Sequence, residues 1–405
     1  MVVNKLTLMK GVTCVSFLCI NIISFLLGDV GITGIARTAI LMGVCYLPLL
    51  YSILKAPRSF PTDAIILAVF ILGLFFLSEL MHPELSDLIK EGISNSILSL
   101  YGIIAAYLFF RTICDKYIVR KALLVSACIY FVFYSYQAII SLSRGYWEEV
   151  GFGGVLQQQS YSMSFGYNML FPTIIFLAFG LNEKNKIFTV VGAIGIVELL
   201  LGGSRAALLS VIVFLGLYWI VFYFSKLSYK QKALSLVLLV IAACAVLFFY
   251  NPILNGIASL LNQLGIDSRN LDKLLSASMT DDMNRALLYE KSGALISSGG
   301  LFGHGIYADR LSLGNYCHNI FLELFIDFGY FGGALVAVYI GIVIYRSLFK
   351  YKDSNWKMIF LIMISSCFTR LLVSYSLWLD VKLWIAFAIY MNMKKERMQN
   401  SRIQR

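Results

Sequence analysis

Residues 318–348 read HNIFLELFIDFGYFGGALVAVYIGIVIYRSL, and the apolar run in their second part decides the fold class. That run, 330–348, has the length that a helix needs to cross a hydrocarbon core of about 30 Å. A bilayer offers no water to the backbone, so such a run must form a helix and cannot form an exposed strand. The whole chain of 405 residues is 59% hydrophobic and 14% charged, which argues against a soluble globular protein.

Runs of this kind recur along the chain and predict an all-α polytopic integral membrane protein with about twelve transmembrane helices. The expected spans are 8–27, 35–54, 63–81, 94–111, 121–142, 162–180, 187–202, 206–224, 232–250, 330–348, 357–375 and 377–393. The connection 251–317 is far longer than the others, and it is expected to be a partly helical outer loop that carries function. The predicted organisation has three parts: spans one to nine in 1–250, the long loop in 251–317, and the last three spans with a tail in 318–405.

The basic residues predict the topology. Placing both chain ends in the cytoplasm puts most of the 33 Lys and Arg residues inside, including those of the tail from Lys394 to Arg405. The outer loops instead collect acidic residues such as Glu84, Asp87 and Glu148. The net charge of +11 is therefore a topology signal, and no nucleic-acid partner is expected. The first apolar run lacks a small-residue cleavage site and is interpreted as an uncleaved helix.

The seventh run ends in a polar turn, Gly202-Gly203-Ser204-Arg205, after an intramembrane carboxylate, Glu198. Such a carboxylate is costly in lipid and is expected to face a cavity or a partner. Ser204 is expected to cap the next helix. Arg205 is then presented at the outer interface, where the alternative to a functional site is an arginine paired with a lipid phosphate.

Two outer loops carry further candidate residues. In the long loop, a capping box at 278–281 predicts a helix through about Ser298. Arg285 and Tyr289 lie on roughly one side of that helix, and Arg310 follows it. In the loop 143–160, Gln158 lies among aromatic and glycine residues, which suits sugar binding; ordinary interfacial anchoring is the alternative.

The histidines are few, and all three are predicted on the outer side: His82, His304 and His318. They are too dispersed for a zinc site, and His304 fits a turn residue. His318 differs, because it begins a membrane segment beside Asn319, with Glu323 and Asp327 one and two turns further along. The cysteines form no CxxC metal site or outer disulfide framework. We therefore expect no metal and no cofactor.

Three motifs carry a resemblance to a known family. The first is Ser204-Arg205 with Gly216 after ten intervening residues. The second is the run from Arg285 to Tyr289 followed by a glycine turn, 300–305. The third is His318-Asn319, nine residues, and then Gly329-Tyr-Phe-Gly332, whose glycines are expected to allow close helix packing behind the histidine. In these motifs the chain resembles the O-antigen polymerase and O-antigen ligase superfamily of bacterial polytopic membrane proteins.

The resemblance implies glycosyl transfer at the periplasmic face of the inner membrane, from oligosaccharides carried on undecaprenyl diphosphate. The arginines Arg205, Arg285 and Arg310 would converge on one cavity and hold the diphosphate bidentately. His318 would act as the base that takes the proton of the attacking sugar hydroxyl. The expected substrate-binding residues are Arg310, Asn319, Glu198, Tyr289 and Gln158. The absence of an Asp-x-Asp motif favours metal-independent transfer.

Three functions fit these features. A polymerase joins two lipid-linked glycans, and the long loop with its short Cys317-His318-Asn319 connection favours it. A ligase would instead transfer the glycan to lipid A-core. A flippase or transporter is the non-enzyme alternative, but transporters place polar residues near the midplane on repeated broken helices, whereas the ionisable residues here gather at the outer boundary. The expected partners are the lipid-linked oligosaccharide, membrane lipid, and a chain-length regulator and flippase of the same pathway.

Overall fold

The computed structural model describes residues 5–57, 60–150, 156–159, 162–235, 255–256, 258–259, 263 and 280–403. Its α-helices are α1 (Lys5–Leu18), α2 (Ile20–Asp29), α3 (Gly34–Lys55), α4 (Thr62–Met81), α5 (Ser86–Gly92), α6 (Ile103–Ile113), α7 (Lys116–Arg144), α8 (Met163–Glu183), α9 (Lys186–Gly202), α10 (Arg205–Tyr218), α13 (Thr280–Gly299), α14 (Ala308–Leu313), α15 (Ile320–Tyr345), α16 (Ser354–Val373) and α17 (Val381–Ile403). Two short strands, β1 (Trp147–Val150) and β2 (Leu156–Gln159), pair in an antiparallel hairpin.

The all-α membrane class is confirmed, whereas the number of twelve spans stays a prediction. Among the described residues, 7 helices are long and apolar enough to cross a membrane, or up to 8 if α1 and α2 count as one span. These two are bent by 66°, so the expected straight first span 8–27 is broken at Cys19. The ninth expected span, 232–250, lies mostly outside the described residues.

The fourth expected span, 94–111, is interrupted. Residues Ile93–Ile97 form a π-helical turn, and α6 begins only at Ile103. Gly102 lies at the break, where a Cβ atom would come within 2.6 Å of the Ser96 carbonyl oxygen. The helix is therefore broken, with close backbone contact at a glycine, inside a run that hydropathy alone makes continuous.

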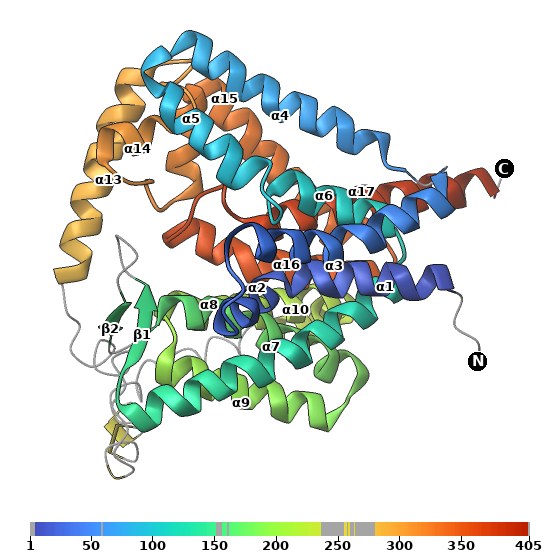
Figure 1. Ribbon diagram of the computed structural model, residues 1–405. Helices are drawn as coiled ribbons and strands as arrows, with labels where there is room; N and C mark the ends of the chain where they lie inside the picture. Colours follow the sequence, from blue (N-terminus) through green and yellow to red (C-terminus); the bar gives the residue numbers. More distant parts are fainter. Residues whose placement is uncertain are drawn as a thin grey trace. The chain divides into compact units, whose positions relative to one another are not determined.

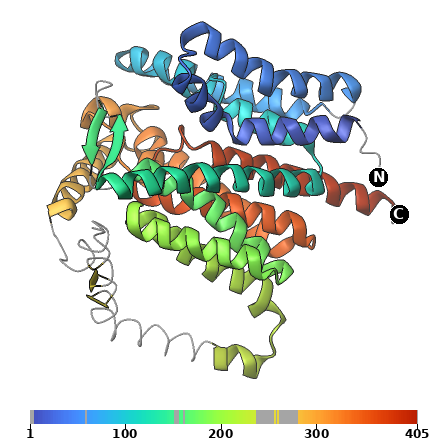
Figure 2. The ribbon, with the colours of Figure 1, turned by 60° about the horizontal axis from the view of Figure 1, so that its bottom comes forward.

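The chain forms two compact units: unit 1 comprises 1–126 and 283–405, and unit 2 comprises 127–282. Within unit 1, the start of α1 and the end of α17 lie at one end, and α13 and α14 lie at the opposite end (Figures 1 and 2). The sequence predicted a different division, into 1–250, 251–317 and 318–405, which was based on membrane topology. The contacts that define the two units do not test that division.

One central helix organises the core of each unit. In unit 1, α16 is buried around most of its circumference, and Ile359, Phe360 and Leu361 are fully inaccessible. A helix that is apolar all round belongs in a protein interior. In unit 2, α8 is the central helix and packs closely on α9, since a Cβ atom on Gly195 would lie 2.3 Å from the Thr173 hydroxyl oxygen. Small residues at such positions allow helix backbones to approach.

Candidate functional site

The candidate site in unit 1 is built on a break in helix α15. Gly329 has φ 67° and ψ −173°, a conformation that essentially only glycine adopts. The break frees the Ile326 carbonyl, which accepts a hydrogen bond of 2.8 Å from the His304 N–H. A Cβ atom on Gly303 would lie 2.4 Å from the Gly329 nitrogen. The turn 300–305 and α15 therefore touch backbone to backbone, and both motif glycines are needed for that contact.

The glycines do not serve the helix packing that the motif was expected to provide. Gly329 meets the 300–305 turn, with the Leu301 carbonyl group 2.4 Å from where its Cβ atom would be. A Cβ atom on Gly332 would meet Phe328 of the same helix, at 2.7 Å. The motif thus marks a broken helix that holds the end of the long loop in place.

We expect Gly329→Ala to destabilise the protein strongly. Its backbone conformation costs a residue with a Cβ atom about 1–3 kcal/mol, and the clash with the turn adds to that. Thermal unfolding in detergent should shift down by roughly 5 °C or more. Gly341→Ala is the matched control on the same helix, because a Cβ atom there has nothing within 4 Å. Equal melting temperatures for the two variants would contradict this role for Gly329.

His304 lies after helix α13 and contacts its C-terminal part. Its Nε2 atom lies 2.9 Å from the Leu295 carbonyl oxygen and 3.0 Å from the Ser298 hydroxyl oxygen. The imidazole thus contacts the C-terminal part of α13 through one backbone carbonyl and one hydroxyl. The interpretation of His304 as a turn residue is consistent with these contacts.

His318 lies directly before α15 in the left-handed region, with φ 57°. This conformation costs a non-glycine residue about 1–2 kcal/mol, and it fixes where the ring points. The imidazole is half-buried and packs on the Tyr316 ring, with centroids 4.3 Å apart. Tyr316 in turn meets Tyr375 edge-on at 6.2 Å. The predicted base is therefore held in an aromatic setting at the start of a membrane helix.

Asn319 has well-defined structural contacts. Its side-chain oxygen accepts hydrogen bonds from the N–H groups of Phe321 (2.9 Å) and Leu322 (3.4 Å), so it caps α15. Its Nδ2 atom donates to the Leu372 carbonyl at 3.0 Å. These bonds tie the start of α15 to the end of α16. Its predicted contact with substrate stays a prediction.

Arg310, on α14, is oriented from two directions. Its guanidinium carbon lies 3.6 Å from the centroid of the Tyr307 ring, and its Nη2 atom donates to the Ser376 hydroxyl at 3.2 Å. The ring is fully buried, and a Cβ atom on Gly92 would lie 2.0 Å from it. Burial raises the pKa of Tyr307 to about 12, so the platform under the guanidinium stays neutral. Among the described residues, the Nε atom of Arg310 has no hydrogen-bond partner.

Three buried carboxylates lie beside Arg310: Asp309, Glu323 and Asp327, each at most 2% exposed. Asp309 accepts from the N–H groups of Arg310 (2.8 Å) and Cys317 (2.9 Å), and burial raises its pKa. Glu323 accepts from the Ser376 hydroxyl and, at 2.7 Å, from the Leu377 N–H.

Asp327 accepts one hydrogen bond of 2.9 Å, from the Trp378 indole, while its Oδ1 atom has no partner among the described residues. One arginine cannot balance three buried negative charges, so the cluster must hold at least one proton. The two acids predicted near His318 thus belong to a network around Arg310.

One segment, 372–378, contacts residues from α14, α15 and the chain between them. The sequence analysis did not predict this segment as part of the site. It supplies the partners of Asn319, Arg310 and Glu323 described above, and its Ser374 carbonyl accepts a hydrogen bond of 3.5 Å from Tyr316. Arg370, one turn before it, places its guanidinium carbon 3.5 Å from the centroid of the Tyr375 ring. An arginine near the end of an expected membrane span is itself a pointer to function, and that signal could have identified Arg370.

The predicted residues of unit 2 lie on a separate set of elements. Ser204 caps α10, as expected, by accepting a hydrogen bond of 3.3 Å from the Ala207 N–H. Arg205 is half-buried at the start of that helix and makes no ion pair with Glu198 or any other described residue. Glu198 accepts a hydrogen bond of 3.0 Å from the Ser135 hydroxyl. The exposed side chain of Gln158 is on β2, opposite Glu148 of β1.

The hairpin of unit 2 is anchored beside the polar turn before Arg205. Trp147 is buried and packs on Phe165, with ring centroids 4.5 Å apart. A Cβ atom on Gly202 would lie 2.1 Å from the Trp147 ring. Trp147 of the 143–160 loop therefore has a packing role, and Gly202 leaves room for its ring because it has no side chain.

The helix predicted in the long loop is present as α13, and its end at Gly299 agrees with the predicted end near Ser298. The first residues of the predicted capping box, 278 and 279, lie outside the described residues. Tyr289 is half-buried on it, and Ser292, one turn further, is fully buried. The side chain of Arg285 lies outside the described part of the structure. Arg205 and Arg310 belong to different units, so the convergence of the three arginines stays a prediction.

Comparison with known proteins gives one finding. A family model described as O-Antigen ligase matches residues 190–337. The chain resembles the O-antigen polymerase and ligase superfamily. This match confirms the resemblance predicted from the three motifs. Neither the curated proteins nor the solved structures give a significant match.

The part that matches the O-Antigen ligase family model runs from α9 into α15 and contains seven of the predicted site residues: Glu198, Arg205, Arg285, Tyr289, Arg310, His318 and Asn319. Gln158 lies before it. The segment 372–378 and Arg370 lie after it, although they hold Arg310 and Asn319 in place. Hence the structure adds to the candidate site a segment that the family match does not include.

Proposed function

We propose that this protein is an O-antigen polymerase, which joins oligosaccharide repeat units carried on undecaprenyl diphosphate at the periplasmic face of the bacterial inner membrane. The observation that carries the proposal is the common attachment of Arg310, Tyr316 and Asn319 to one short segment, 372–378. This attachment fixes an anion-binding side chain and the surroundings of His318 with respect to each other. Glycosyl transfer from a lipid diphosphate needs such a pair.

The donor side of the reaction requires charge stabilisation. As the bond between the sugar C1 atom and the diphosphate oxygen breaks, negative charge grows on the phosphate oxygens. The guanidinium of Arg310, held flat on Tyr307, would donate hydrogen bonds to those oxygens without ever losing its proton. Arg370, stacked in the same way on Tyr375, would act with it. Arg205 and Arg285 would also bind phosphate oxygens of the substrate.

The acceptor side requires a base and a surface for the sugar. The imidazole of His318 would take the proton of the attacking hydroxyl as that oxygen bonds to C1. Tyr316 and Tyr375, whose rings meet edge-on, would offer apolar faces to sugar rings. The fixed backbone of His318 would hold the base at one depth relative to the diphosphate.

The ligase alternative uses the same chemistry with a different acceptor, lipid A-core. The experiment that separates the two functions is removal of the protein from its cell, followed by analysis of lipid-linked glycans. A polymerase predicts single repeat units on lipid A-core. Long polymer retained on undecaprenyl diphosphate would instead indicate a ligase, and unextended units confined to the cytoplasmic face would indicate a flippase.

A further inference from the structure

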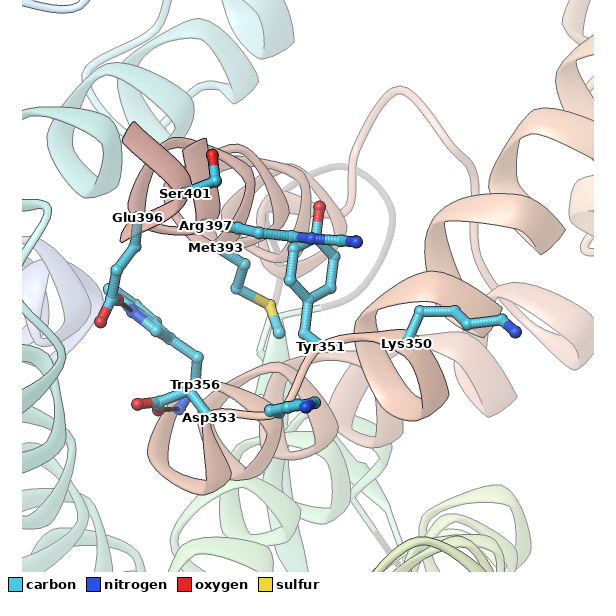
Figure 3. A pocket seen from close by; sticks show the side chains of 9 residues that line it. Lys350, Tyr351, Asp353, Trp356, Met393, Glu396, Arg397 and Ser401 are labelled. Atoms are coloured by element: carbon cyan, nitrogen blue, oxygen red, sulfur yellow. Dashed lines mark hydrogen bonds between the residues drawn. The ribbon is translucent and has the colours of Figure 1, made fainter. Parts of the chain in front are cut away.

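A second feature of unit 1 lies at the end opposite α13 and α14. A cavity of about 560 Å³ opens between the loop that joins α15 to α16 and the last turns of α17 (Figure 3). Tyr351 and Arg397 line it, and they also line two adjoining cavities of about 330 and 340 Å³. The three hollows thus form one continuous depression around a tyrosine ring.

The depression is basic. The cations that line it come from the end of α15 and the turn after it, and from α17: Arg346, Lys350, Lys352, Lys394 and Arg397. No carboxylate of the described residues lies within ion-pair distance of any of them. The guanidinium carbon of Arg397 lies 5.9 Å from the centroid of the Tyr351 ring. Cations brought together without counter-charges are unfavourable unless an anion joins them.

The two acidic side chains in the lining do not balance these cations, because other groups engage them. Lys116 of α7 binds Asp353 at 2.5 Å and Glu396 at 2.7 Å. Asp353 also caps α16 through the Trp356 N–H at 2.9 Å, and Glu396 accepts from the Trp356 indole. The positive-inside pattern accounts for basic residues at this end in general, but it does not require them to surround a cavity.

An apolar strip leads along α15 to the depression. Its large side chains are exposed at helical spacing: Leu335, Val338, Tyr339, Ile342, Tyr345 and Phe349. The Tyr339 ring stacks on Phe387 of α17, with centroids 6.1 Å apart. A ligand with an anionic head and hydrocarbon tails could therefore occupy the depression and the strip together. A soluble anion would occupy only the depression.

We propose that this depression binds the phosphate of an anionic phospholipid whose acyl chains lie along the α15 strip. Arginine and lysine side chains at such a site bind phosphate through charge-assisted hydrogen bonds, and basic pockets at the cytoplasmic ends of membrane helices suit lipid head groups. The proposal is independent of the glycosyl transfer proposed for the opposite end of the unit.

The test is native mass spectrometry of the full-length protein released from detergent, with phosphatidylglycerol and phosphatidylcholine as probes. Wild type should retain phosphatidylglycerol in preference to phosphatidylcholine. The double variant Arg346→Gln/Arg397→Gln should lose about tenfold or more of that retention. The matched control Lys55→Gln/Lys230→Gln removes two exposed lysines that line none of these hollows and should retain it.

A second variant and a competitor complete the test. If the arginine variant does not fold, Lys350→Gln/Lys394→Gln carries the same expectation, because both side chains are exposed. Inorganic phosphate and glycerol 1-phosphate at millimolar concentration should not displace the lipid. Displacement by these soluble anions would assign the site to a soluble phosphate and overturn the lipid proposal. An equal loss in the control variant, or no preference for phosphatidylglycerol in wild type, would also overturn it.

Discussion

Replacing His318 with glutamine should slow polymerisation by about 10²–10⁴-fold, the contribution of a general base. Glutamine keeps a hydrogen-bonding side chain but cannot accept the proton of a sugar hydroxyl. His318→Asn should lose as much, and it is the better-folded variant, because asparagine tolerates the left-handed backbone at φ 57°. The measurement is the rate of polymer formation by the purified protein at matched concentration.

The control for this prediction is His82→Gln. His82 is also expected on the outer side, but it lies 3.4 Å from Glu84 at the end of α4 and beside Gly305, and no contact with the 372–378 segment is among its described interactions. Its replacement should leave the rate unchanged. If His318→Gln or His318→Asn keeps most of the wild-type rate, His318 positions a substrate and is not the base. Departure of the diphosphate, driven by the arginines, would then be the main catalytic contribution.

Arg310→Lys should reduce the rate by about 10²–10³-fold although the positive charge is kept. Lysine cannot lie flat on the Tyr307 ring while donating to Ser376, and it cannot bind two phosphate oxygens in a planar fork. The same loss is expected for Arg370→Lys, because Tyr375 supports its guanidinium in the same way.

Arg144→Lys is the matched control for the arginine variants. Arg144 is exposed at the end of α7, 3.6 Å from Glu148, and an exposed pair of this kind contributes little. Its replacement should therefore be silent. Full activity of Arg310→Lys and Arg370→Lys, together with Arg205→Lys and Arg285→Lys, would contradict the binding of the diphosphate by arginines.

Most of the fold class could be predicted from the sequence, because membrane helices are long and locally determined. The run 357–375 predicted α16, and the helix expected through about Ser298 corresponds to α13. Breaks inside apolar runs were harder to predict. The bend at Cys19 and the helix break at Gly102 depend on packing of the chain, which hydropathy does not report.

The candidate site was predictable in its motif residues and not in their partners. Arg310, His318 and the break at Gly329 were visible as polar or glycine positions in an apolar context. The sequence Ser374-Tyr-Ser-Leu-Trp378 was not, because it is apolar enough to be divided between two expected spans, 357–375 and 377–393. Outside the helix, the Leu377 N–H donates to the carboxylate of Glu323, a residue distant in the chain.

The basic depression at the opposite end was interpreted from sequence only as a topology signal. Lys350 and Lys352 occur with Arg397 around one tyrosine because the segment that follows α15 meets the last turns of α17. That convergence is a property of the tertiary structure. It turns basic residues that the sequence offers only as a topology signal into a candidate lipid site.

The central claim is tested most directly by reconstituting the purified protein with a defined undecaprenyl-diphosphate-linked repeat unit as both donor and acceptor, without lipid A-core. A polymerase predicts a ladder of glycans of increasing length, all still on undecaprenyl diphosphate, with release of the free lipid diphosphate. His318→Gln should give no ladder under the same conditions. A wild-type protein that forms no ladder but transfers the unit once lipid A-core is added would contradict the account and identify a ligase.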